Sequence, residues 1–211
     1  MAINPVNALT LPAGLYRRFQ AAMRPLGRLP AHDHTPLITC LSGGADSTAL
    51  ALLAEIYARQ TRRQHTAIII DHGIRPAAAQ EAARTMRSMR DCGIGSIIRR
   101  VTAKAPSSSI QAWARAQRYA IASAEARQQR AVLLLGHHVG DQAETVWMRL
   151  NCGSGLAGLA GMRALARRDG VVILRPLLGF QRHELEQICH NGRVAWETDP
   201  SNADTRFERV R

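Results

Sequence analysis

Short apolar runs alternate with longer amphipathic stretches along most of the chain. The runs are about six residues long and rich in Ile, Leu and Val, which is typical of buried strands. We predict strands at residues 36–41, 66–71, 96–101, 131–136 and 171–176.

The stretches between these runs carry apolar residues at helical spacing. One such stripe consists of Val139, Ala143, Val146, Trp147 and Leu150. Ser108 and Gln111 have the spacing of a capping box ahead of a long helix. We predict helices at residues 46–59, 77–91, 109–129, 139–150 and 180–191.

This alternation predicts βαβ units and therefore an α/β fold, a parallel twisted five-stranded sheet with helices on both faces. We divide the chain into an N-terminal arm (1–36), a sheet domain (37–191) and a basic C-terminal tail (192–211). Ligands of such sheets bind beyond the carboxyl ends of the strands. Three polar segments are expected to meet there, and they are residues 42–47, 71–73 and 136–144.

Composition narrows the class of protein. The formal net charge of +12 favours a polyanionic partner such as nucleic acid, although a basic protein without that partner remains the alternative. The four cysteines form no C-x-x-C pair and are expected to be reduced thiols of a cytoplasmic protein. No apolar run reaches the ~20 residues that span a bilayer, and the first residues lack a signal-peptide pattern, so no membrane partner is expected.

The segment that follows the first predicted strand has the features of a phosphate-binding loop. Glycine lets the backbone approach an anion, and the first amides of a helix attract it. The candidates for this contact are Ser42, Gly43, Gly44, Ala45, Asp46 and Ser47. No lysine follows the glycines, so the segment is not a P-loop of the G-x-x-x-x-G-K-[ST] type. The alternative is a tight turn in which Ser42 or Asp46 caps the helix.

Asp46 distinguishes this loop from one that holds phosphates through a lysine. A carboxylate beside a triphosphate repels it unless Mg²⁺ lies between them. A loop of this kind suits holding the β- and γ-phosphates as a leaving group while the α-phosphate is attacked. The sequence therefore indicates adenylation with ATP and Mg²⁺.

Other polar residues at the same sheet edge are further candidates. Asp141 and Glu144 share one helix face, where they either bind a metal or a cationic amine or only favour the helix N-terminus. Asp71 and His72 either border the nucleotide or form a turn, and Arg115 either reaches a phosphate or is solvated. Gly136 is included with the nucleotide-binding residues and Arg118 is placed on the surface. His137 and His138 are expected to form structural hydrogen bonds more readily than a transition-metal site with Asp141.

The segment "SGGADS" (42–47) resembles the S-G-G-x-D-S signature of the PP-loop, or N-type, ATP pyrophosphatases. Within that class, the chain from about residue 37 to 211 is similar to the tRNA(Ile)-lysidine synthetases. The similar blocks follow in the same order, and they are "DHGIRPAAAQEA", "QAWARAQRY", "LLGHHVGDQAETVWMRL", "GSGLAGLAGM", "RPLL" and "WETDPSNADTRFERVR".

The resemblance implies an adenine-nucleotide alpha hydrolase-like fold and ligation of L-lysine to C2 of the wobble cytidine of tRNA(Ile) with a CAU anticodon. The partners are then tRNA(Ile) and free L-lysine. It also implies that residues 42–47 hold the triphosphate, that Asp46 and Asp141 bind Mg²⁺, and that Asp141 and Glu144 orient the metal or the lysine. The glycine-rich segment 152–161 is then a lid, and Arg206, Arg209 and Arg211 contact phosphates.

Two other functions remain open from the sequence. A different PP-loop enzyme, such as a tRNA thiolase, is expected to carry a C-x-x-C cluster or a cysteine pair, and the spacing here offers none. A non-catalytic nucleotide-binding RNA module is disfavoured by the intact set of Asp46, Asp141 and Glu144. Members of the resembled family commonly continue into further domains, so the chain is either a piece of a longer protein or a short natural form. The sequence predicts no oligomeric state.

Overall fold

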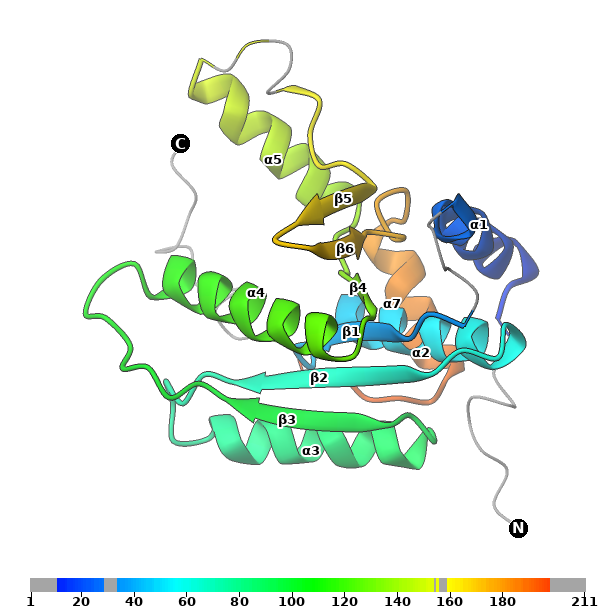
Figure 1. Ribbon diagram of the computed structural model, residues 1–211, viewed down its shortest axis with the longest axis horizontal. Coiled ribbons are helices and arrows are strands. Elements are labelled where there is room, and N and C mark those ends of the chain that lie inside the picture. The colour runs from blue at the N-terminus through cyan, green and yellow to red at the C-terminus, as the bar shows by residue number, and fades with distance from the viewer. Residues whose placement is uncertain (1–10, 29–33, 154, 156–158, 198–211) are drawn as a thin grey trace.

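A computed structural model describes residues 11–28, 34–153, 155 and 159–197 of the chain (Figure 1). The strands are β1 (Leu37–Leu41), β2 (His65–Asp71), β3 (Ser96–Arg100), β4 (Val132–Leu134), β5 (Leu165–Arg168) and β6 (Val171–Leu174). The helices are α1 (Ala13–Met23), the 3-10 helix η1 (Arg24–Arg28), α2 (Ala45–Gln60), α3 (Ala78–Asp91), α4 (Ile110–Gln128), α5 (Val139–Asn151) and α7 (Arg182–Asn191).

The strands form one sheet in the order β3-β2-β1-β4-β6-β5. All neighbouring pairs are parallel except β5 and β6, which run antiparallel. The predicted α/β class with five parallel strands is therefore confirmed. The prediction missed β5, a sixth strand at the edge of the sheet.

The sequence did contain a signal for β5. Asp169 and Gly170 join it to β6 and both have positive φ, 49° and 78°. An Asp-Gly pair of this kind forms the two-residue turn that favours a hairpin. The strand itself, "LARR", has too few apolar residues to stand out as a buried run.

The apolar residues of the sheet divide between two cores because successive side chains of a strand point to opposite faces. Leu37, Leu41, Ala67 and Ile69 join one core with residues of α1, α2, α3 and α7. A second, smaller core lies on the other face under α4, and it contains Ile38, Cys40, Ile68, Ala122, Ala126 and Leu133. Helices therefore cover both faces, as predicted (Figure 1).

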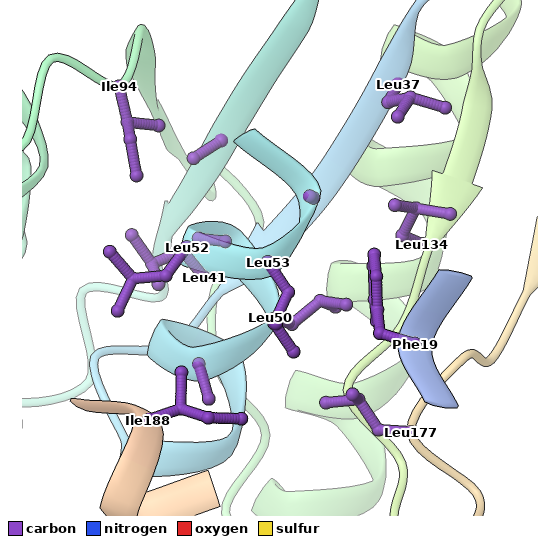
Figure 2. Close-up of a cluster of buried hydrophobic side chains, with 14 of the residues drawn as sticks. Phe19, Leu37, Leu41, Leu50, Leu52, Leu53, Ile94, Leu134, Leu177 and Ile188 are labelled. Carbon is purple, nitrogen blue, oxygen red and sulfur yellow. The ribbon is translucent and has the colours of Figure 1, made fainter. Parts of the chain in front are cut away.

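Helix α1 packs into the larger core. Phe19 and Met23 are fully buried, and Figure 2 shows Phe19 lying among Leu50, Leu134 and Leu177. Residues assigned to the N-terminal arm thus contribute to the same core as the sheet. Buried aromatic and aliphatic side chains of this size stabilise a fold by about 1.5–3 kcal/mol each.

Two local expectations differ from the structure. Helix α4 begins at Ile110, and its N-cap is Ser109, which has a left-handed backbone and makes no side-chain cap hydrogen bond. The predicted capping box of Ser108 and Gln111 is therefore wrong. In α5 the apolar stripe is largely uncovered, because no residue of this helix is buried and Trp147 and Leu150 are 62% and 50% exposed. The helix extends away from the sheet (Figure 1).

Cys40, Cys92 and Cys189 are buried, Cys152 is exposed, and all four are free thiols. Among the helices in the described part of the chain, none has the length and apolar character needed to cross a bilayer.

Candidate nucleotide site at the carboxyl edge of the sheet

The strand order reverses between β1 and β4, so the chain leaves these neighbouring strands in opposite directions. Such a switch point opens a crevice at the carboxyl edge of a parallel sheet. A cavity of about 570 Å³ lies at this edge, within the size range of small-molecule sites. The predicted site residues that line it are Ser42, Gly44, Ala45, Asp46, Ser47, Asp71, His72, Arg115, Gly136 and Asp141.

Gly43 and Glu144 are the predicted site residues that are not among the lining residues of this cavity. Glu144 is exposed on α5, so the structure does not bring it to the cavity with Asp141. Gly43 belongs to the loop but has its carbonyl oxygen bonded to the backbone N–H of Glu197, at 2.9 Å.

The loop between β1 and α2 is held by its own hydroxyl groups. The Oγ of Ser47 accepts a hydrogen bond from the Ser42 N–H at 3.1 Å and donates to the Gly44 carbonyl at 3.0 Å. The two serine hydroxyls also lie 3.0 Å apart. These bonds shape the loop before any ligand arrives and leave the first amides of α2 for an anion.

Asp46 lies in the first turn of α2 with a side chain that is 33% exposed. One of its carboxylate oxygens, Oδ1, is buried and has no hydrogen-bond partner among the described residues. Burial raises the pKa of this carboxyl, while the nearby charges of His138 and Arg182 oppose the rise. A buried carboxylate oxygen without a partner is costly, which indicates a role that requires a cation.

The His138 ring lies between the carboxylates of Asp46 and Asp141. Its Nδ1 accepts a hydrogen bond from the Gly140 N–H at 2.9 Å, which leaves Nε2 as the ring nitrogen that carries a proton. That Nε2 lies 3.6 Å from Oδ2 of Asp46 and 3.8 Å from Oδ2 of Asp141. Asp141 in turn accepts the backbone N–H of His138 at 2.8 Å, which fixes its carboxylate at the start of α5.

Two glycines make this arrangement possible. A Cβ at Gly140 would lie 2.6 Å from Cε1 of His138, so the His138 ring would have to move to make room for a side chain. A Cβ at Gly136 would lie 3.4 Å from the backbone oxygen of Asp46, so Gly136 allows the end of β4 to approach the start of α2. Gly136, which was predicted as a nucleotide-binding residue, therefore has a role in packing as well.

Asp71 and His72 occupy the edge of the cavity at the end of β2. Asp71 is buried, and its Oδ1 accepts the Gly73 N–H at 2.8 Å, so its carboxylate holds the turn. The Nδ1 of His72 is buried and has no partner among the described residues. Burial, together with the charge of Arg118, lowers the pKa of His72, which keeps its ring neutral near pH 7.

Helix α4 places arginine side chains along one side of the cavity. Arg115 lies with its guanidinium 5.7 Å from the ring centre of Tyr119, and both side chains line the cavity. Arg118, which was predicted only as a surface residue, lines it as well and is half-buried. The spacing of Arg115 and Arg118 in the sequence indicated that both reach the cavity, because residues three or four apart share a helix face.

The pKa of His137 is lowered mainly by burial. Burial, followed by the charges of Arg175, Arg115 and Arg118, lowers the pKa of His137 to about 4 against the opposing effect of Asp141. Its ring is therefore neutral at pH 7, and its buried Nδ1 is unpartnered within the described residues. Arg182 of α7 is a further lining residue that the sequence did not indicate.

The site suits Mg²⁺ better than a transition metal. Within the described ranges, no three His, Cys, Asp or Glu side chains are grouped to hold a metal ion. Mg²⁺ usually binds through one or two carboxylates together with substrate phosphates and water. Asp46, with its unpartnered Oδ1, and Asp141 match that requirement.

The fold and the lysine-free loop define the class of protein. The chain belongs to the family described as the PP-loop domain, whose family model matches residues 15–211, and this family indicates ATP binding.

Curated relatives narrow the comparison. The chain is 42% identical over 200 residues to the tRNA(Ile)-lysidine synthase of Hyphomonas neptunium, covering 92% of this chain and 53% of the relative. It is 40% identical over 206 residues to the protein of the same name from Novosphingobium aromaticivorans, covering 94% and 60%. The chain thus spans about half the length of the curated relatives it matches.

Solved structures are similar in fold. The U34-tRNA thiolase NcsA from Methanococcus maripaludis superposes with a TM-score of 0.71 at 18% identity, covering 93% of this chain and 67% of that one. The NAD+ synthetase from Burkholderia pseudomallei has a TM-score of 0.54 at 18% identity, covering 90% and 72%. At these identities the likeness concerns the fold alone.

Proposed function

We propose that the chain is the nucleotide-binding and catalytic part of a tRNA(Ile)-lysidine synthase. The reaction is ATP-dependent ligation of L-lysine to C2 of the wobble cytidine of tRNA(Ile), with release of AMP and pyrophosphate. The names of the curated relatives support this reaction, and the formal net charge of +12 suits an RNA substrate. Such an enzyme works in the cytoplasm on free tRNA and free lysine.

The observation that carries the proposal is Asp46 in a phosphate loop without a lysine. Asp46 lines the cavity together with the loop, and its Oδ1 has no partner among the described residues, so a cation is needed between this carboxylate and a triphosphate. Mg²⁺ held by Asp46 and Asp141 would neutralise the pyrophosphate as it leaves. The first amides of α2 would bind the β- and γ-phosphates, which leaves the α-phosphorus open to attack.

The proposed reaction has two steps, and residues of the chain act in each of them. Arg115 and Arg118 line the cavity and stabilise the negative charge that develops as the cytosine O2 attacks the α-phosphorus and pyrophosphate leaves. In the second step the lysine ε-amine attacks C2, and the O2 departs with AMP. Asp141 orients the ammonium group, and the proton that the amine releases passes to water.

Mass spectrometry of a tRNA(Ile) transcript tests the proposal. The chain, ATP, Mg²⁺ and lysine are expected to add one lysine to the anticodon fragment, and omitting lysine abolishes the product. Asp141→Ala is expected to lose it, while Asp91→Ala, at an exposed position on α3, keeps it. A sulfur-containing product, formed when sulfide is supplied in place of lysine, would identify a thiolase instead, and nucleotide binding without any product would identify a non-catalytic module.

A further inference from the structure

The chain returns to the phosphate loop after α7, through residues 194–197, which we call the return segment. Val194 is buried, and Trp196 packs against the larger core with its ring 4.9 Å from that of His190. Trp196 and Glu197 line the nucleotide cavity. The segment is thus docked beside the loop by its own apolar side chains.

Glu197 makes two separate contacts there. Its backbone N–H donates to the Gly43 carbonyl at 2.9 Å. Its carboxylate accepts both Nε and Nη2 of Arg84 on α3, at 3.0 and 2.9 Å. Both side chains of that ion pair are 49% exposed, so the pair itself contributes little stability. The backbone bond is the contact that acts on the loop.

This bond determines which way one loop amide points. The peptide that joins Gly43 to Gly44 is trans, so its C=O and its N–H point in opposite directions. Because the carbonyl points to the Glu197 N–H, the Gly44 N–H points to the opposite side of this peptide, and Gly44 lines the cavity. No acceptor for this N–H is found among the described residues, whereas the Ser42 N–H is already bonded to Ser47.

The peptide would otherwise be free to turn over. Gly43 has φ of +88°, a conformation that glycine adopts at no steric cost, and Gly44 adds a second residue without a side chain. A turned peptide would direct the Gly43 carbonyl oxygen at the place where a phosphate oxygen binds. Binding would then require the peptide to turn back first, which weakens the apparent affinity.

We infer that the return segment positions the phosphate loop: the Glu197 N–H holds the Gly43 carbonyl and so aims the Gly44 N–H at the bound polyphosphate. The inference rests on the proposed use of this loop for ATP. It makes Glu197 a positioning residue that acts through its backbone, and it couples the chain beyond α7 to nucleotide affinity.

Proline at position 197 tests the inference because it removes the N–H, together with the exposed carboxylate that pairs with Arg84. In isothermal titration with Mg-ATP, Glu197→Pro is expected to weaken binding about tenfold, the effect of one lost preorganising hydrogen bond. Glu197→Gln keeps the N–H and loses only the exposed ion pair, so its affinity is expected to stay within about twofold. In turnover assays Glu197→Pro is expected to raise KM for ATP with kcat nearly unchanged.

¹⁵N NMR on the uniformly labelled wild-type chain gives a second test that does not depend on how the variant folds. Adding Mg-pyrophosphate is expected to shift the Gly44 amide resonance strongly and that of Gly170, in the turn between β5 and β6, little. A static Gly44 resonance beside shifting Ala45 and Asp46 amides overturns the inference, as does equal ATP affinity of Glu197→Pro and wild type. A wild-type chain that binds no ATP contradicts the proposed function instead.

Discussion

Replacing Asp46 by Asn should stabilise the ligand-free protein while it destroys the binding of Mg-ATP. The carboxylate is two-thirds buried, and its Oδ1 has no partner among the described residues. A buried polar atom without a partner costs about 1–3 kcal/mol. Against this cost, an ionised acid in the first turn of a helix stabilises the fold by about 0.3–1 kcal/mol through the helix dipole. Asparagine keeps the shape and a polar atom at this place but removes the buried charge, which is the larger part of this cost, so we expect a net gain of about 1 kcal/mol.

The direction in which the stability of the wild type changes with pH follows from the raised pKa of Asp46. Burial raises the pKa of Asp46 above its ordinary value of 3.8, so the folded protein holds this proton to higher pH than the unfolded chain does. The wild type therefore loses stability as pH rises from 3.8 through the raised folded pKa, and Asp46→Asn does not. The advantage of the variant is fully present above the folded pKa and disappears as pH falls below the unfolded value.

Differential scanning fluorimetry without nucleotide is the assay. A gain of about 1 kcal/mol corresponds to a Tm about 2–4 °C higher for a chain of this size, at neutral pH. The exposed Asp91 gives a matched control, since Asp91→Asn is expected to change the free energy of unfolding by less than about 0.5 kcal/mol. A lower Tm for Asp46→Asn at neutral pH would refute the reasoning and show that the carboxylate serves as a structural cap.

Three further substitutions test other parts of the structure. Gly140→Ala places a Cβ 2.6 Å from the His138 ring, so we expect a loss of about 1–3 kcal/mol in urea denaturation, and an unchanged midpoint would contradict that contact. Phe19→Ala is expected to cost about 3–5 kcal/mol in the same assay, because Phe19 is fully buried; a loss below about 1 kcal/mol would show that α1 is not part of the core. Arg118→Ala is expected to raise KM for ATP about tenfold, whereas Arg90→Ala, on the exposed side of α3, leaves it unchanged, and equal KM values would remove Arg118 from the site.

The parallel strands were predictable because each is a run of apolar residues buried on both faces. Residues such as Ile68 and Ile69 belong to opposite cores, which requires both to be apolar. Strand β5 was missed because it lies at the sheet edge, where burial does not select apolar residues, and Arg167 and Arg168 are exposed there. The hairpin signal of Asp169 and Gly170 was available but was not used.

The loop residues of the site were predictable because the chemistry of phosphate binding restricts residue types over a few consecutive positions. Arg118 and Arg182 were missed because they come from α4 and α7, and only the packing of these helices brings them to the loop. The contact of Glu197 with Gly43 joins residues far apart in sequence through backbone atoms, so no residue type could indicate it. Arg206, Arg209 and Arg211 lie outside the described residues, as does part of the predicted lid at 152–161.

The products formed from ATP labelled at the α-phosphate test the central claim most directly. With the wild-type chain, Mg²⁺, lysine and a tRNA(Ile) transcript, the account predicts labelled AMP, with pyrophosphate as the other product, and no labelled AMP from Asp46→Asn. Labelled ADP, formed with orthophosphate, would contradict a loop that holds pyrophosphate as the leaving group.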